Sequence, residues 1–205
     1  MPSLFYESAK WQQGYQYVAG IDEAGRGPLA GPVSAAAVIL PEAFSHDLLN
    51  DSKKLGEKRR EALYEELTQR ADIRWAISHG EVDEIDSLNI LKSTHAAMLR
   101  AAEGLDPRPD FCLIDGLDVP GFALPSEGIV KGDSKSFSIA AASILAKVSR
   151  DRRMLKYAAL YPEYGFERHK GYGTKLHLEA LRKHGPCPIH RKSFAPVAQL
   201  SLPLD

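Results

Sequence analysis

Residues 17–40 read YVAGIDEAGRGPLAGPVSAAAVIL, and this stretch decides the fold. Its two apolar runs, Tyr17 to Asp22 and Pro32 to Leu40, are typical of strands. A turn rich in glycine and proline, Gly25 to Gly31, joins them. The pattern therefore predicts that a β-hairpin opens the fold.

The rest of the chain alternates helical and strand patterns. Apolar spacing and capping residues predict helices over 57–70, 88–103, 138–160 and 174–184, and strands over 73–78 and 111–114. Asp133 and Ser134 are the candidates to cap the long helix. The predicted fold class is α/β, with a mixed β-sheet flanked by helices. We expect a single domain over 1–198, with a helical C-terminal extension over about 134–190, and a short tail over 199–205.

Composition bounds the class of protein. The 205 residues are 44% hydrophobic and 26% charged, which is near the globular average and excludes a disordered, collagen-like or coiled-coil chain. The longest apolar run, Val33 to Leu40, is too short for a membrane span, so we expect no membrane association. The first residues lack a secretory pattern, and Cys112 and Cys187 are the only cysteines. These features predict a cytoplasmic protein, and nothing in the sequence requires more than a monomer.

The basic residues are unevenly distributed along a nearly neutral chain. Residues 131–192 hold 14 Lys or Arg against 5 Asp or Glu, whereas the remainder holds 12 basic and 22 acidic residues. This asymmetry favours a surface that faces a polyanion, although solvated basic helix faces give the same pattern. The candidates for a duplex-facing surface are Arg150, Arg152, Arg153, Lys156, Lys170, Lys175, Arg182 and Lys183.

Four acidic residues follow apolar runs, where carboxylates are disfavoured. Asp22 and Glu23 end the first strand, Asp115 follows the run 111–114, and Asp133 follows 128–132. A buried carboxylate needs a partner or a cation to offset its desolvation. Because the set contains no His or Cys, it predicts a site for Mg²⁺ or Mn²⁺.

Each of these acidic residues also has a structural interpretation. Asp133 could cap the long helix, Asp115 with the glycine after it could form a turn, and Asp22 with Glu23 could mark the hairpin. Neighbouring residues of a strand face opposite sides. Asp22 and Glu23 can therefore share a site only if the strand breaks between them.

The glycine-rich turn allows two interpretations. Its pattern G-x-G-x-x-x-G is one residue longer than the dinucleotide-binding fingerprint, and Pro28 removes a hydrogen-bond donor, so a nucleotide cofactor is disfavoured. The glycines instead let the main chain approach a ligand closely, with Arg26 available for a phosphate. This second interpretation suits a polynucleotide backbone.

Five motifs together closely resemble the bacterial ribonuclease HII family. They are IDEAGRGPLAGPV at 21–33, DSKKL at 51–55, LIDG at 113–116, KGD at 131–133 with SIAAASI at 138–144, and HKGYGT at 169–174. The resemblance runs from about Tyr17 to Val197 in the family's order and spacing. It implies a ribonuclease H-like fold and cleavage of the RNA strand of RNA–DNA hybrids. It also implies nicking 5′ of single ribonucleotides in duplex DNA and a role in removing ribonucleotides from DNA.

The same resemblance implies the catalytic residues. Asp22, Glu23, Asp115 and Asp133 would bind two divalent ions, Mg²⁺ or Mn²⁺, and act as the catalytic carboxylates. A two-metal hydrolysis of the phosphodiester would leave a 3′-OH and a 5′-phosphate.

Further residues would bind the substrate. By the resemblance, Gly25, Arg26 and Gly27 recognise the ribose 2′-OH, and Tyr172 stacks on the sugar of the following deoxynucleotide. Lys53 would contact the substrate backbone.

Other classes stay open on the sequence alone. A DNA junction nuclease of related fold would not need to recognise a 2′-OH, and a hybrid-binding module would not need catalysis. The four carboxylates argue against the module, because like charges weaken binding to a polyanion unless metals neutralise them. His177 and His184 could share a helix face, but a zinc site would lack a third ligand.

The last residues carry a separate pattern. Gln199 to Leu204, QLSLPL, resembles the short peptides by which bacterial replication proteins dock on the sliding clamp. Three leucines on a proline-stiffened tail favour a groove that receives them. The alternative is a tail that folds back onto its own domain.

Overall fold

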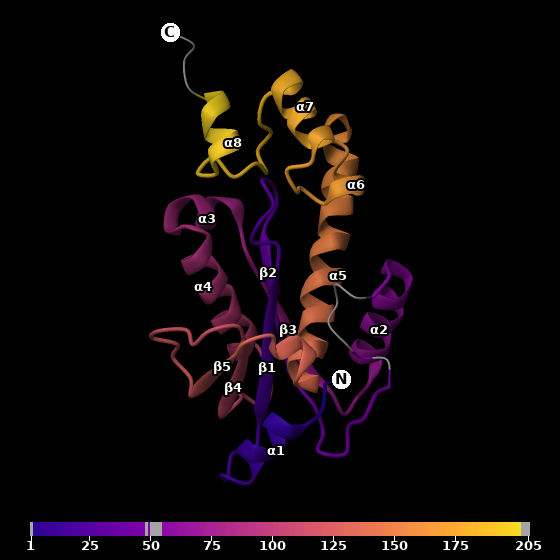
Figure 1. Ribbon diagram of the computed structural model, residues 1–205, viewed down its shortest axis with the longest axis vertical. Coiled ribbons are helices and arrows are strands. Elements are labelled where there is room, and N and C mark those ends of the chain that lie inside the picture. The colour runs from indigo at the N-terminus through magenta and orange to yellow at the C-terminus, as the bar shows by residue number, and fades with distance from the viewer. Residues whose placement is uncertain (1, 48, 50–54, 202–205) are drawn as a thin grey trace.

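The computed structural model describes residues 2–47, 49 and 55–201, with the side chain of the last excepted. Its sheet has five strands in the order β3-β2-β1-β4-β5. The strands are β1 (Val18–Ala24), β2 (Val33–Ile39), β3 (Arg74–Gly80), β4 (Phe111–Asp115) and β5 (Ser126–Ile129). β1 and β2 form the predicted antiparallel hairpin, β3 extends it, and β4 and β5 run parallel to β1 (Figure 1). The mixed sheet flanked by helices is confirmed.

Helices cover both faces of the sheet (Figure 1). They are α1 (Phe5–Trp11), α2 (Glu57–Gln69), α3 (Val82–Leu88), α4 (Ile90–Glu103), α5 (Phe137–Leu160), α6 (Phe166–His169), α7 (Lys175–His184) and α8 (Ala195–Ala198). Short 3₁₀ turns are η2 (Gly132–Ser134), η3 (Pro162–Tyr164) and η4 (Gln199–Ser201). None of the helices within these ranges combines the length and the apolar character that crossing a membrane requires.

Alternation along β2 divides the core into two layers. Ala36 and Val38 pack with the alanine-rich start of α5 and with α2, whereas Ala35 and Ala37 pack with α4. Burial of both faces explains why β2 is apolar apart from Ser34, rather than alternating between polar and apolar residues.

Helix α5 lies close to the sheet at Gly20. A Cβ atom on Gly20 would lie 2.2 Å from the backbone carbon of Ser138, so only glycine permits this approach. The first turn of α5 is held by the buried Glu7, whose carboxylate accepts bonds from the Ser138 N–H at 2.9 Å and the Ser136 hydroxyl at 2.6 Å. These contacts fix the segment just before α5, which carries Asp133.

The prediction that Asp133 or Ser134 caps α5 is wrong. Ser136 is the N-cap, and its hydroxyl accepts the Ile139 N–H at 3.2 Å. Asp133 and Ser134 lie in η2, one turn earlier. The capping interpretation therefore no longer accounts for an acidic residue at 133.

The C-terminal half of α5 extends beyond the sheet and carries the helical extension (Figure 1). Helices α6 to α8 pack around Met154 of α5 and around Leu29 and Ala30 of the hairpin turn. The glycine-rich turn thus lies between the sheet and the C-terminal helices.

Candidate active site

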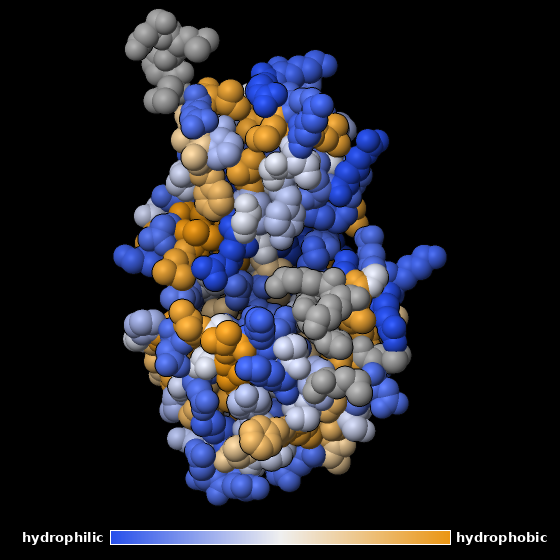
Figure 2. Space-filling view, viewed as in Figure 1, coloured by the Kyte–Doolittle hydropathy of each residue, from blue (hydrophilic) through white to orange (hydrophobic). Residues whose placement is uncertain are grey.

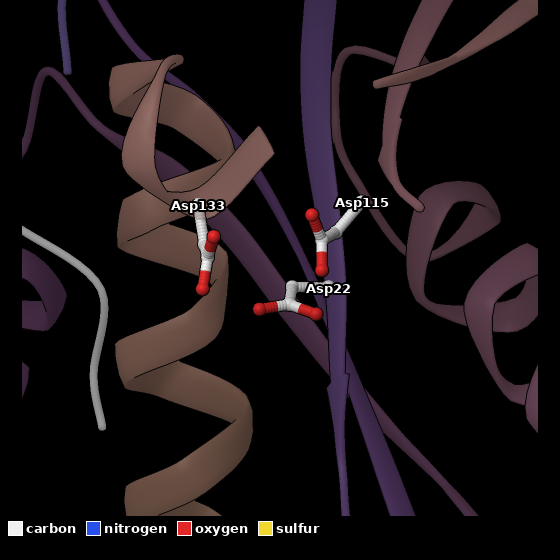
Figure 3. A group of neighbouring side chains, drawn as sticks. All are labelled: Asp22, Asp115 and Asp133. Atoms are coloured by element: carbon white, nitrogen blue, oxygen red, sulfur yellow. The ribbon is translucent and has the colours of Figure 1, made fainter. Parts of the chain in front are cut away.

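Three aspartates meet at the carboxyl ends of parallel strands. Asp22 lies in β1, Asp115 ends β4, and Asp133 follows β5 within η2. Ligand atoms of the three carboxylates all lie within 4.8 Å of one another, and Figure 3 shows the three side chains pointing into a shared space. Carboxyl ends of neighbouring parallel strands share one edge of a sheet, so residues distant in sequence converge there.

Burial and like charge make this group unfavourable without a counterion. Asp22 is 5% exposed and Asp133 is 7% exposed. Burial, followed by repulsion from Glu23 and Asp115, raises the pKa of Asp22 well above its usual value. Hard oxygen ligands, with no His or Cys among them, are the donor set that Mg²⁺ and Mn²⁺ prefer. The chemistry of the donors therefore fits divalent cations.

Backbone donors hold two of these carboxylates in place. Asp115 accepts the Gly132 N–H at 2.6 Å, which ties the end of β4 to η2. Asp22 accepts the Glu23 N–H at 2.7 Å. Backbone N–H groups of the site's own segments therefore orient the carboxylates of Asp115 and Asp22.

Glu23 lies beside the three aspartates but outside their group. The expected break between Asp22 and Glu23 is not present, because β1 continues to Ala24. Glu23 instead contacts the half-exposed Arg26, with Oε1 and Nη1 3.3 Å apart. Both residues border two neighbouring cavities, of which one also contains Asp22 and the other Asp115. Glu23 is close enough to Asp22 for its charge to raise the pKa of that carboxyl.

The glycine-rich turn and Tyr172 line the same cleft as Asp22. This cavity of about 220 Å³ is bounded by Asp22 to Gly27, by Ser143, Lys147 and Arg150 of α5, and by Tyr172. In Figure 2 hydrophilic residues surround a hollow at mid-height, below the C-terminal helices. Tyr172 is 45% exposed, so its ring is accessible from solvent.

Ser143 and Lys147 border the cleft although neither was predicted from the sequence. Together with Arg150 they recur at spacings of four and three on one face of a mostly apolar stretch of α5. That spacing is the signal that could have identified them. Lys147 forms an ion pair with Asp151 at 2.8 Å on the same helix.

Three histidines behind Tyr172 form a second unpredicted feature. The Cys187 N–H donates to Nδ1 of His190, so His190 carries its proton on Nε2 and donates it to His177 Nε2 at 3.0 Å. His177 in turn donates from Nδ1 to the carbonyl oxygen of Tyr172 at 2.9 Å. His169 stacks on His177 with ring centres 4.5 Å apart. This relay of neutral histidines replaces the helix-face pairing of His177 with His184.

Acid is expected to destabilise the fold through this relay. Burial lowers the pKa of both His177 and His190 to about 4, against about 6.5 in an unfolded chain. Between these values the unfolded chain binds protons that the folded chain does not. The free energy of unfolding should therefore fall as the pH decreases from 7 to 5, by on the order of 2 kcal/mol for each histidine.

Urea unfolding at several pH values tests this expectation. The His177→Gln variant should show a shallower dependence between pH 7 and 5 than the parent chain. Equal slopes for the two proteins would show that the relay does not carry the effect.

The predicted duplex-facing surface needs a correction at Arg150. Arg150 is 1% exposed, so it cannot face a duplex. Arg152 pairs with Glu61 and Glu65 of α2, and Arg153 pairs with Glu81. The sequence pattern shows the charges of these arginines but not their partners, which come from distant segments.

Two predicted features lie wholly or partly outside the described residues. Lys53 falls in the stretch 50–54, and Leu202 to Leu204 of the tail fall beyond residue 201. The start of the tail, Gln199 to Ser201, forms η4 directly after α8, and Leu200 borders a cavity with Leu178 and Leu181.

Comparison with known proteins gives a consistent result. Residues 19–197 match the family model described as Ribonuclease HII. A ribonuclease HII from Desulfitobacterium hafniense is 58% identical over 193 residues, which cover 94% of this chain and 74% of that protein. The residues matched by the family model include all four predicted acidic positions.

Solved structures share the fold. Ribonuclease H2 from Pyrococcus horikoshii OT3 aligns with a TM-score of 0.74 and 27% identity, covering 90% of this chain and 97% of that one. A complex of PCNA and ribonuclease HII from Archaeoglobus fulgidus aligns with a TM-score of 0.71 and 27% identity, covering 87% and 95%.

Proposed function

This chain belongs to the ribonuclease HII family of metal-dependent endoribonucleases, and from this premise we propose what its site selects and cuts. The substrates are the RNA strand of an RNA–DNA hybrid and a single ribonucleotide within duplex DNA. The chain nicks 5′ of the ribonucleotide and leaves a 3′-OH and a 5′-phosphate, which serves the removal of ribonucleotides from DNA. Family membership decides against a junction nuclease and a non-catalytic module.

One observation carries this proposal. Asp22 belongs both to the group of three aspartates and to the cavity that the Gly25–Gly27 turn and Tyr172 line. A site able to hold cations and a set of backbone groups able to contact a sugar therefore share one cleft. This juxtaposition supports hydrolysis at a position that the sugar determines.

The carboxylates of Asp22, Glu23, Asp115 and Asp133 would hold two divalent ions, Mg²⁺ or Mn²⁺. When bound, such ions generate a nucleophilic hydroxide and stabilise the leaving oxygen. The chain's own contribution is to orient these carboxylates. Gly132 fixes Asp115 through its N–H, and the backbone of Glu23 fixes Asp22. Asp133 and Glu23 would supply the remaining carboxylate ligands.

Recognition of the ribose is assigned to the turn and to Tyr172. The 2′-OH is the group that distinguishes RNA from DNA, and it can donate and accept hydrogen bonds. Backbone groups of Gly25, Arg26 and Gly27 are the proposed partners of this hydroxyl. The ring of Tyr172 would stack on the sugar of the next deoxynucleotide. Lys53, outside the described residues, is proposed to contact the backbone.

A nicking assay tests the proposed function. One labelled DNA duplex with a single ribonucleotide is incubated with Mg²⁺, Mn²⁺ or EDTA, beside an all-DNA duplex of the same sequence. We expect metal-dependent nicking only on the 5′ side of the ribonucleotide. Cleavage of the all-DNA duplex, or cleavage in EDTA, would contradict the proposal.

Tyr172→Ala is expected to weaken the preference for a ribonucleotide-to-deoxyribonucleotide junction by about tenfold, because stacking on an aromatic ring is lost. Tyr172→Phe keeps the ring and should behave like the parent chain. The measurement is kcat/KM on a junction duplex relative to a continuous hybrid. An unchanged ratio in Tyr172→Ala would remove this residue from the recognition site.

We also propose that Gln199 to Leu204 docks on a sliding clamp. The motif QLSLPL supports this, and the related Archaeoglobus fulgidus protein is solved in complex with PCNA. A chain ending at Ala198 should lose clamp binding in a pull-down assay while keeping its nuclease activity. Retention of clamp binding would favour a tail folded against its own domain. For the remainder we propose a single catalytic domain over 1–198, acting as a monomer in the cytoplasm.

A further inference from the structure

Two buried arginines lie behind the glycine-rich turn. Arg150 of α5 is 1% exposed and Arg191 is 0% exposed. Within the described ranges neither guanidinium forms an ion pair with a carboxylate. Burial and the charge of Arg150 lower the pKa of Arg191 to about 9, which leaves Arg191 charged at neutral pH. Burying such a charge is unfavourable unless many hydrogen bonds hold it.

Arg191 binds the carbonyl oxygens of the turn. Its Nη2 donates to Gly25 at 2.6 Å, its Nη1 to Arg26 at 2.9 Å, and its Nε to Gly31 at 2.9 Å. Its backbone N–H also donates to Leu29 at 2.9 Å. One side chain therefore fixes both ends of the turn through three carbonyl groups.

Arg150 connects the turn to the segment of Tyr172. Its Nη2 donates to Ala30 at 3.1 Å and its Nη1 donates to Lys170 at 3.0 Å. Its guanidinium lies 6.0 Å from the centre of the Tyr172 ring. The Leu29 N–H donates to the Gly171 carbonyl at 2.8 Å, which adds a direct backbone bond between the two segments.

The turn is shaped to fit Arg150. Gly25 has a φ of +97°, which favours glycine, and a Cβ there would lie 1.9 Å from Nε of Arg150. Arg150 therefore occupies the space that a side chain at position 25 would need. The close packing makes the position of the turn depend on this guanidinium.

These bonds determine which backbone groups the turn can offer. The carbonyl oxygens of Gly25 and Arg26 already accept bonds from Arg191. For the N–H groups of Gly25, Arg26 and Gly27, no hydrogen-bond partner is found among the residues that the structure describes. The same three residues border the cleft. The turn therefore has backbone donors available at the cleft for a sugar oxygen.

We propose that Arg150 and Arg191 are positioning residues for substrate selection. Arg191 sets the conformation of the Gly25–Gly27 turn, and Arg150 sets the separation of that turn from Tyr172. Together they determine the preference for a ribonucleotide over a deoxyribonucleotide. This inference rests on the proposed function and assigns its specificity to two buried residues, of which Arg150 borders the cleft and Arg191 holds the turn that lines it.

The test uses Arg191→Lys and Arg150→Lys in the full chain with Mg²⁺. Lysine keeps the charge but lacks the planar fork that reaches three carbonyl groups. Two constants are measured for each variant. One is the KM for a duplex with one ribonucleotide, and the other is the inhibition constant of an all-DNA duplex of the same sequence. Leu67→Ala, a buried change in α2 remote from the cleft, is the control for lost stability.

We expect each lysine variant to raise the KM by about tenfold while the inhibition constant of the all-DNA duplex stays within about twofold. The ratio of the all-DNA inhibition constant to the KM then falls about tenfold. Leu67→Ala should lower only the active fraction, and hence kcat, with the ratio unchanged. The unchanged inhibition constant also shows that a lysine variant is folded.

Failure of the proposed function and failure of the inference about the two arginines give different results. If the parent chain does not nick the ribonucleotide duplex, the proposed function fails. If the parent chain nicks it and both folded lysine variants keep the parent ratio with a lower kcat, the arginines have a structural role only and the inference is overturned. If one variant does not fold, the ratio for the other variant decides.

Discussion

Asp115→Asn is expected to reduce turnover by about a thousandfold, which corresponds to about 4 kcal/mol of transition-state stabilisation. The substitution removes one negative charge from the group that Asp115 forms with Asp22 and Asp133. An amide oxygen at this position can still accept the Gly132 N–H, which lies 2.6 Å from the Asp115 carboxylate. The fold and the affinity for duplex should therefore be retained. Single-turnover nicking and duplex binding by fluorescence anisotropy measure the two effects separately.

Asp118→Asn provides a matched control for this experiment. Asp118 accepts the Gly128 N–H at 2.7 Å, so it makes the same type of backbone bond, but it lies outside the group of three aspartates. Its turnover should stay within about twofold of the parent chain, because Asp118 is not one of the three grouped carboxylates. If Asp115→Asn loses turnover and duplex affinity to the same degree, Asp115 supports the fold rather than the chemistry.

Gly20→Ala is expected to lower the free energy of unfolding by about 3 kcal/mol or more. The added Cβ would lie 2.2 Å from a backbone atom of Ser138, and backbone cannot move aside as a flexible side chain can. Helix α5 would have to shift away from the sheet. Since η2 and Asp133 directly precede α5, nicking activity should fall along with stability.

Urea unfolding of Gly20→Ala and Gly56→Ala measures the stability effect. A Cβ added to Gly56 would have no neighbouring atom within 4 Å, and the φ of Gly56 is negative, so alanine is tolerated there and little change is expected. A loss below about 1 kcal/mol for Gly20→Ala would mean that α5 can shift over the sheet without penalty. The close approach would then not be needed for the site.

Local patterns were enough to predict most elements of the fold. The hairpin, α2, α4 and α7 follow from apolar spacing and caps. In the structure Asn89 caps α4 by accepting the Lys92 N–H at 3.1 Å. The predicted helix over 138–160 begins within one residue of α5, but its N-cap was assigned wrongly because several residues before it are acceptable caps. β5 was not predicted as a strand, because its four residues are stabilised by pairing with β4 rather than by their own propensity.

The candidate site, like the fold, was predicted only in part from the sequence. The acidic residues could be selected from the sequence, because a carboxylate after an apolar run needs an explanation wherever its partners lie. Their grouping required the parallel pairing of β1, β4 and β5. The position of Glu23 could not be predicted from the sequence. Glu23 lies beside the aspartates rather than among them because β1 continues to Ala24.

The sequence by itself determined the family, the α/β class and the four acidic residues, because motifs and periodicity are properties of neighbouring residues. Only the tertiary structure decided the roles of Arg150, Arg191 and the histidines. Arg150 was interpreted from the sequence as facing a duplex and His177 as lying on a helix face, no role was predicted for Arg191, and all three are buried. Their partners are carbonyl oxygens and ring nitrogens up to 166 positions away along the chain. A buried polar group is defined by such partners, and no local pattern records them.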